Sequence, residues 1–203
     1  MRYILSHDLG TSGNKASLFC DSGRLVASYT QEYETCYPSA GWAEQNPDDW
    51  WKAVCVATWR VLEGVDRNKI AAVAVTGQMM GTVAIGTDGK VTGNSIIWSD
   101  SRAEQECRLL VERLGAEHYY GITGQPPSAA YSLPKIMWLK ENRPEQYRRT
   151  DKYVQSKDYI NYLLTGNIGT YDTDAAYTIA YDIKNRCWSE EILSRALVLL
   201  RMP

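Results

Sequence analysis

An aspartate followed at once by a turn of glycine and hydroxyl residues lies near the start of the chain. The segment runs Asp8-Leu9-Gly10-Thr11-Ser12-Gly13-Asn14-Lys15. Glycines such as Gly10 let the backbone approach a phosphate closely, and N–H groups with the hydroxyls of Thr11 and Ser12 can bind phosphate oxygens. Asp8 could hold Mg²⁺ directly or through water, since this cation prefers oxygen ligands. Lys15 could supply a compensating positive charge.

A second interpretation of this segment stays open. Gly and Asn also occupy positive-φ positions in a plain hairpin turn, which needs no ligand. The segment does not match the GxxxxGK[ST] pattern, so a P-loop nucleotide-binding site is excluded.

The elements that must position this turn are predicted as strands. Apolar and β-branched runs indicate strands at residues 3–9, 15–20, 24–33, 70–76, 82–87, 90–92 and 95–98. Asp88-Gly89 is a strong hairpin signal between two of these runs. Alternation is imperfect in the early strands, which favours coverage on both faces, and the run at 70–76 is typical of a buried strand.

Helices are predicted from capping residues followed by apolar side chains at helical spacing. The expected first residues or caps are Asn46-Pro47, Ser101 with Glu104, Pro134, Pro144, Ser156 and Ser189, with Gly115 and Gly166 as helix ends. The segment 169–188 is mixed and indicates a loop with a short hairpin. The last helix places Ile192, Leu193, Ala196, Leu197 and Leu200 on one face.

Composition narrows the class of protein. The chain has 203 residues and a formal net charge of −2, so it offers no single-sign field for nucleic acid or an anionic membrane. Its first residues are too polar for a signal peptide, and no run approaches the roughly 18 apolar residues of a membrane span. Five scattered cysteines without a CxxC pair indicate a reducing compartment. We expect a cytoplasmic protein of one domain.

The last predicted helix is strongly amphipathic, yet the sequence stops two residues after its apolar face, at Met202-Pro203. This favours a chain cut from a longer protein.

A strand ending in DLGTSG, with a second strand after it, resembles the first phosphate hairpin of the actin-like ATPases. More narrowly, essentially the whole chain is similar to the FGGY family of carbohydrate kinases, and xylulokinases are the members it resembles most. The matching stretches are AEQNPDDWW, VTGQMMG, IIWSDSR, KIMWLKEN, and DTDAA followed by AYDIKNRCW. Five matches in the right order are more specific than any one of them.

This resemblance implies a ribonuclease-H-like, actin-type α/β fold with a mixed sheet and helices on both faces. It implies transfer of the γ-phosphoryl group of ATP, with Mg²⁺, to a hydroxyl of a ketose or polyol. Residues 1–203 would form the amino-terminal sugar- and phosphate-binding domain, incomplete at its C-terminal end. The catalytic aspartate and the adenosine-binding second domain would lie beyond Pro203, so this chain alone should be inactive. Its open cleft surface should also make it self-associate.

The resemblance also assigns roles to single residues. Asp8 matches the family's metal- and phosphate-associated aspartate, and Thr11, Ser12 and Lys15 match its nucleotide-phosphate contacts. The residues expected at the sugar are Gln78, Met79, Met80, Trp98, Asp100 and Arg102. Xylulokinases typically have histidine where this chain has Met80, which removes a hydrogen-bond donor to a sugar hydroxyl. The identity of the sugar therefore stays open.

Two other classes remain as alternatives. The chain could be a non-catalytic sugar-binding module or pseudokinase, or an actin- or chaperone-like nucleotide switch that shares only the fold. The GQMMG and IIWSDSR stretches favour sugar over the switch. His7 precedes Asp8 in a strand, so its side chain should point to the opposite face and is expected to be a buried structural histidine.

Overall fold

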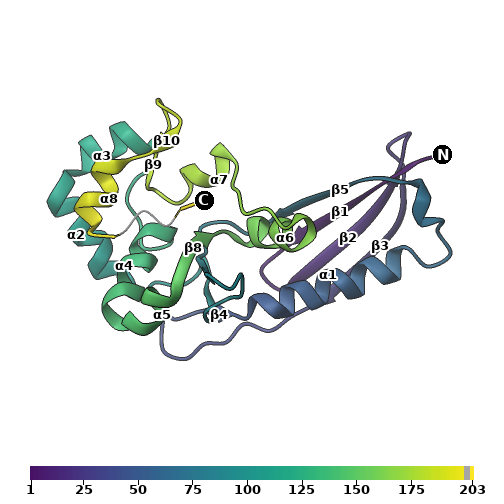
Figure 1. Cartoon of the computed structure of the whole chain (residues 1–203), viewed down its shortest axis with the longest axis horizontal. Coiled ribbons are helices and arrows are strands. Elements are labelled where there is room, and N and C mark those ends of the chain that lie inside the picture. The colour runs from purple at the N-terminus through teal and green to yellow at the C-terminus, as the bar shows by residue number, and fades with distance from the viewer. Residues whose placement is uncertain (199–201) are drawn as a thin grey trace.

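The main sheet is built from four strands in the order β3-β2-β1-β5 (Figure 1). The computed structural model describes residues 1–198 and 202–203. Strands β1 (Tyr3–Leu9), β2 (Gly13–Cys20) and β3 (Leu25–Glu32) form an antiparallel meander. Strand β5 (Ile70–Gly77) adds to β1 in the parallel direction, so the sheet is mixed, as predicted.

Helices cover one face of this sheet within the described residues. Helix α1 (Pro47–Val61) packs on β2 and β3, and α6 (Ser156–Thr165) packs beside it on β5. Leu5 and Leu9 of β1 are buried on the helix side. Asp8 lies on the other face, which is more exposed. We predicted helices on both faces, and the described chain supplies them on one.

A second group of elements lies at the end of the molecule away from the N-terminus (Figure 1). Its strands pair as β4 (Glu44–Gln45) with β7 (Ser95–Ile96), β6 (Val83–Gly86) with β8 (Thr150–Val154), and β9 (Tyr181–Asp182) with β10 (Cys187–Trp188). Its helices are α2 (Glu104–Leu114), α3 (Ala116–Thr123), α4 (Ser132–Asn142), α5 (Pro144–Arg149), α7 (Asp172–Ala176) and α8 (Glu190–Ala196). A short 3₁₀ turn at Arg67–Lys69 precedes β5.

The larger hydrophobic core fills this second group. It includes Tyr119, Leu133, Ile136, Ile179 and Ile192, each with at most 2% of its surface exposed. Among the described residues, no helix combines the length and apolar character needed to cross a membrane.

Several predicted helix boundaries are confirmed because their signals are local. The Asn46 side chain accepts a hydrogen bond from the Asp48 amide, with Pro47 as the first helical residue. Ser189 likewise accepts from the Ile192 amide at 3.3 Å. Gly166 ends α6 in the left-handed conformation.

Other expectations were wrong. Ser101 does not cap α2, because its hydroxyl donates to the Gly41 carbonyl and the N-cap is Ala103. Gln155, not Ser156, caps α6. Leu197 is 60% exposed and ends α8, and the expected contact of Leu200 lies outside the described residues.

The strand predictions also need three corrections. Residues 90–92 form single backbone contacts to β6 but no strand. Strand β5 was expected to be buried, yet as the edge of this sheet it leaves Val73 47% exposed. The strand β8 lies in a region where we predicted helices alone, because its five residues are flanked by strong helix signals on both sides.

Candidate functional site

The predicted phosphate turn is a tight hairpin at the end of β1 and β2. Asp8 and Lys15 lie opposite each other in the antiparallel register, and both are exposed. The Gly10 amide donates to the Gly13 carbonyl at 3.0 Å, which closes the turn. A Cβ on Gly13 would lie 2.8 Å from the Gln31 carbonyl oxygen, so only glycine lets the hairpin pack this closely on β3.

Tyr33, just after β3, holds the hairpin from the side. Its hydroxyl donates to the Gly10 carbonyl at 2.5 Å, and its amide donates to the Ser12 carbonyl at 3.2 Å. Burial and the negative charge of Asp8 raise the pKa of this phenol, so it remains a proton donor at neutral pH. Sequence reasoning missed Tyr33, because it lies about 20 residues after the turn it holds.

The predicted sugar loop begins directly beside this hairpin. The Gln78 amide donates to the Leu9 carbonyl at 2.7 Å, which continues the pairing of β5 with β1. The Gln78 side chain donates to Gln45 Oε1, also at 2.7 Å. Met79 and Met80 follow in the connection to β6, and both are half-buried.

Gln45 joins the two predicted halves of the site. This side chain is 1% exposed, donates from Nε2 to the Thr11 carbonyl at 2.6 Å, and accepts at Oε1 from Gln78. The indole of Trp50 in α1 also donates to Oε1 at 3.0 Å, which fixes the orientation of the amide. Gln45 is in the AEQNPDDWW stretch, but no spacing in the sequence indicates these partners.

Trp98 forms a second link between the two segments. Its indole Nε1 donates to the Thr11 hydroxyl at 3.0 Å, while 42% of the residue remains exposed. The structure thus brings the phosphate turn, the sugar loop and Trp98 together, although they are far apart in the sequence.

Asp100 and Arg102 do not lie on the surface of this site. Neither side chain has any exposed surface, and Arg102 Nη2 contacts Asp100 at 2.7 Å. Arg102 Nη1 contacts Glu44 Oε1, also at 2.7 Å, and the guanidinium stacks 3.9 Å from the ring centroid of Trp42. The Asp100 carboxylate also accepts from the Ala43 amide at 2.6 Å. We therefore correct their predicted role from sugar contact to buried support.

His7 is a structural residue. It is 2% exposed on the face opposite Asp8, as predicted. Asn14 Nδ2 lies 3.2 Å from its Nδ1, and the Thr58 hydroxyl lies 3.3 Å from its Nε2. Since Asn14 donates from an amide, this network assigns the ring proton to Nε2. Burial lowers the pKa of His7, which keeps the ring neutral.

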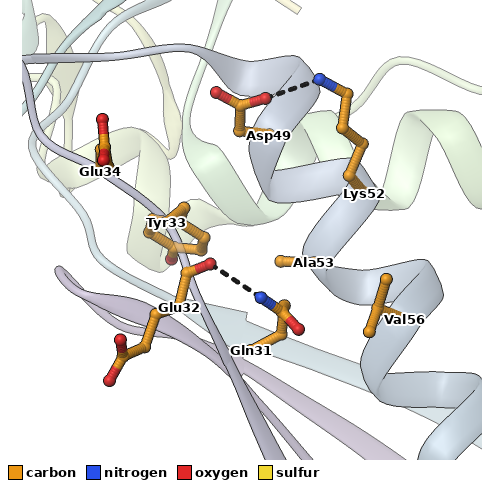
Figure 2. A pocket seen from close by; sticks show the side chains of 8 residues that line it. All are labelled: Gln31, Glu32, Tyr33, Glu34, Asp49, Lys52, Ala53 and Val56. Carbon is orange, nitrogen blue, oxygen red and sulfur yellow. Dashed lines mark hydrogen bonds and ion pairs between the residues drawn. The ribbon is translucent and has the colours of Figure 1, made fainter.

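A separate surface groove of about 360 Å³ lies between β3 and α1 (Figure 2). Its walls carry the carboxylates of Glu32, Glu34 and Asp49, and the Lys52 ammonium beside them pairs with Asp49 at 2.7 Å. Grouped carboxylates repel a phosphate, so this groove does not fit the predicted ligand.

Comparison with known proteins identifies the same family as the sequence motifs. The family model for the "FGGY family of carbohydrate kinases, N-terminal domain" matches residues 3–199. The chain is 35% identical over 195 residues to the xylulose kinase of Staphylococcus xylosus, covering 96% of this chain and 40% of that protein. It is 32% identical over 201 residues to a glycerol kinase of Thermococcus gammatolerans, covering 95% of this chain and 40% of that protein.

Solved structures agree with the sequence relatives. The ligand-bound xylulose kinase of Lactobacillus acidophilus superposes with a TM-score of 0.93 at 30% identity, covering all of this chain and 41% of that one. This confirms the predicted fold class, that of the actin-like sugar kinases. The chain spans about 40% of the length of these relatives. It belongs to the FGGY family of carbohydrate kinases, in which it matches the N-terminal domain.

Proposed function

We propose that this chain supplies the sugar loop and one side of the phosphate clamp of an ATP-dependent kinase that phosphorylates a hydroxyl of a ketose or polyol. The observation that carries the proposal is the double connection at Thr11. Gln45 ties its carbonyl to Gln78, and Trp98 binds its hydroxyl. A phosphoryl group and an acceptor hydroxyl must meet within a few ångströms, and these contacts hold their expected binding segments side by side.

The donor set of the hairpin fits a nucleotide phosphate with Mg²⁺. Asp8 offers an exposed carboxylate for the cation, Lys15 offers a nearby positive charge, and Thr11 and Ser12 offer hydroxyls. Within residues 1–198 and 202–203, no group of three or more His, Cys, Asp and Glu is arranged to hold a metal. Mg²⁺ would therefore share Asp8 with phosphate oxygens, as is usual for this ion. ATP would supply the transferred phosphoryl group.

The sugar would contact the segment formed by Gln78, Met79, Met80 and Trp98. Gln78 and Trp98 combine amide and aromatic groups, which suit the hydroxyls and the apolar face of a sugar. Support for a ketose or polyol comes from the names of the relatives, a xylulose kinase and a glycerol kinase.

The remaining parts of the proposal concern the setting of the protein. We propose a cytoplasmic enzyme, in keeping with five free thiols. We also propose that the isolated chain self-associates through exposed apolar side chains such as Trp59, Val73 and Leu164, which are 65%, 47% and 44% exposed. Size-exclusion chromatography over a range of concentrations tests this point.

Isothermal titration calorimetry of the purified chain tests the proposed function. D-xylulose, xylitol and glycerol are titrated with and without MgADP, and at least one should bind with a Kd in the millimolar range, about −4 kcal/mol. Gln78→Leu should abolish that binding, whereas Gln31→Leu, a matched change at a half-buried position near the end of β3, should not. Binding of MgADP without any sugar would favour a nucleotide switch, and binding of neither would contradict the proposal.

A further inference from the structure

Met80 has an unusual backbone conformation in the middle of the sugar loop. Its φ is +66°, in the left-handed region that costs a non-glycine residue roughly 1–2 kcal/mol. Such a conformation persists only when surrounding contacts impose it. Both backbone polar groups of Met80 are bound by side chains from elsewhere in the chain, namely Lys135 and Gln155.

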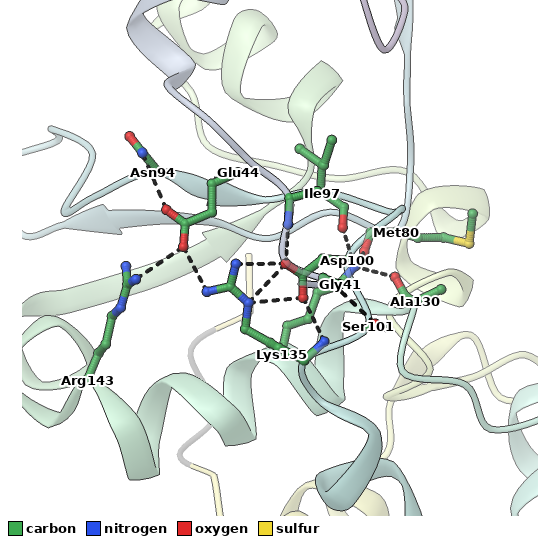
Figure 3. Close-up of polar contacts among 12 residues, drawn as sticks. Gly41, Glu44, Met80, Asn94, Ile97, Asp100, Ser101, Ala130, Lys135 and Arg143 are labelled. Atoms are coloured by element: carbon green, nitrogen blue, oxygen red, sulfur yellow. Dashed lines mark hydrogen bonds and ion pairs between the residues drawn. The ribbon is translucent and has the colours of Figure 1, made fainter. Parts of the chain in front are cut away.

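Lys135 of α4 binds Met80 from one side. The residue is 0% exposed, and its Nζ donates to the carbonyls of Met80 and Ile97, each at 2.9 Å, and to that of Ala130 (Figure 3). An ammonium has three N–H donors, so its hydrogen-bonding capacity is fully used. The three carbonyls belong to the sugar loop, to the residue before Trp98 and to the loop that leads into α4.

Gln155 binds Met80 from the other side. It is 2% exposed, and its Oε1 accepts from the Met80 amide at 2.7 Å. Its Nε2 donates to the Asp174 carbonyl at 2.7 Å, which ties the loop to α7. The next residue, Ser156, donates from its hydroxyl to the Gln78 carbonyl at 2.5 Å. The junction of β8 and α6 therefore holds the loop on both sides of Met79.

The burial of Lys135 argues for a role beyond general stability. A buried ammonium costs free energy that an apolar side chain of similar volume would not. Asp100 supplies a nearby opposite charge, but the three hydrogen bonds of Nζ all go to carbonyls of loops around the site. An apolar side chain would fill the same space and leave these loops unconnected.

We propose that Lys135 and Gln155 are positioning residues that hold the Met80 peptide in its left-handed conformation and so fix how Gln78, Met79 and Met80 are presented to the sugar. The inference rests on the proposed function for its sugar, but the clamp on the loop is a property of the chain itself. The two parts can be tested separately.

The test compares Lys135→Met and Gln155→Leu with Lys140→Met, a matched change on the same helix, where Nζ donates to the distant Leu197 carbonyl. Amide hydrogen exchange and Met methyl NMR spectra report on the loop, and D-xylulose titration reports on binding. In each clamp variant the amides of Met80 and Gly81 should exchange about tenfold faster, the size expected for one lost hydrogen bond of roughly 1.4 kcal/mol. The β1 amides should be unchanged in every variant. Lys140→Met should leave the exchange at Met80 and Gly81 and the signals of the five native methionines in place, and add only the signal of its own new methyl.

The outcomes separate the two proposals. A faster-exchanging loop together with about tenfold weaker D-xylulose binding supports both. A faster-exchanging loop in a chain that binds no sugar supports the clamp and contradicts the proposed function. Unchanged exchange at Met80 and Gly81 in both clamp variants overturns the clamp. Should Lys135→Met fail to fold, Gln155→Leu alone decides by the same criterion.

Discussion

The indole N–H of Trp98 donates to the hydroxyl of Thr11 across 3.0 Å, joining two residues that are 87 positions apart in the sequence. One is in the expected sugar segment and the other in the expected phosphate turn. A single hydrogen bond between exposed partners adds only about 1 kcal/mol, so its value lies in relative placement more than in stability. If ligand binding moves one of these segments, the hydrogen bond should transmit that movement to the other.

Trp98→Phe tests whether Trp98 lies beside the bound sugar. Phenylalanine keeps an aromatic face for a sugar but lacks the N–H donor to Thr11. We expect the sugar-dependent change in tryptophan emission to be lost, while the midpoint of thermal unfolding changes by only a few degrees. Trp59→Phe, which alters a 65% exposed tryptophan on α1, serves as the control and should keep the sugar response. A full response in Trp98→Phe would mean that Trp98 does not report on the site.

Asp8→Asn should remove phosphoryl transfer in a full-length kinase that contains this chain. The carboxylate is exposed at the end of β1, where its loss leaves no buried gap but removes the negative charge proposed to hold Mg²⁺. We expect a rate about 10³-fold lower, equivalent to several kcal/mol in the transition state, with an unchanged circular dichroism spectrum. Asp21→Asn, at the opposite end of the same β1–β2 pair, is the control and should leave the rate of phosphoryl transfer nearly unchanged. Near-normal turnover in Asp8→Asn would contradict the proposed role of Asp8 at Mg²⁺ and the nucleotide phosphates.

The parts of the fold that could be predicted depend on short-range signals. The DLGTSG hairpin, the Asn46-Pro47 helix start and the Gly166 helix end are each set by neighbouring residues, so the sequence displays them directly. The exposed edge of β5 could not be predicted in this way. Its apolar composition suits a buried strand, but exposure depends on which strands are present to pair with it.

The supports of the site could not be predicted from spacing. The contacts of Gln45, Lys135 and Gln155 with Thr11, Gln78, Met80 and Ile97 span 33 to 75 residues of sequence. Asp100 and Arg102 were placed in the right region, but their type alone does not say whether a charged side chain faces a ligand or a buried partner. Burial and ion-pair geometry, which only the fold determines, decide between the two.

Because Arg102 is buried between two carboxylates, its replacement should reduce folding stability. Arg102→Met should lower the free energy of unfolding by roughly 3–5 kcal/mol, because Asp100 and Glu44 lose their main partner while remaining at most 5% exposed. Urea unfolding followed by circular dichroism measures this. The matched change Arg148→Met breaks only a solvent-exposed pair with Glu145 and should cost less than about 1 kcal/mol. If Arg102→Met is no more destabilising than Arg148→Met, the ion pairs of Arg102 with Asp100 and Glu44 contribute little to folding stability.

Asp158 should make the folding stability of the chain depend on pH. Burial, with the nearby charge of Asp174, raises the pKa of this carboxyl to about 6, against 3.8 for an unperturbed aspartate. The folded state therefore binds the proton more tightly than the unfolded state, and this contribution to stability is present below about pH 4 and lost as pH rises through about 6. The free energy of unfolding of Asp158→Asn, compared with that of the parent chain, should increase by roughly 2–3 kcal/mol as the pH rises from about 4 to 7. Exposed Asp151→Asn is the control. A difference that stays flat with pH contradicts the assignment.

Residues 1–203 alone should not phosphorylate any sugar. Phosphoryl transfer needs a nucleotide held on both sides and a group that accepts the hydroxyl proton. Neither carboxylate near the sugar loop in the described residues suits that role, because Asp100 is held by Arg102 without exposed surface and Asp8 is proposed to hold Mg²⁺ at the phosphate turn. An ADP-release assay with D-xylulose, xylitol and glycerol checks this, with the Asp8→Asn chain as the background control. Sugar-dependent ADP above that background would mean that a proton acceptor and a complete nucleotide site exist within these 203 residues.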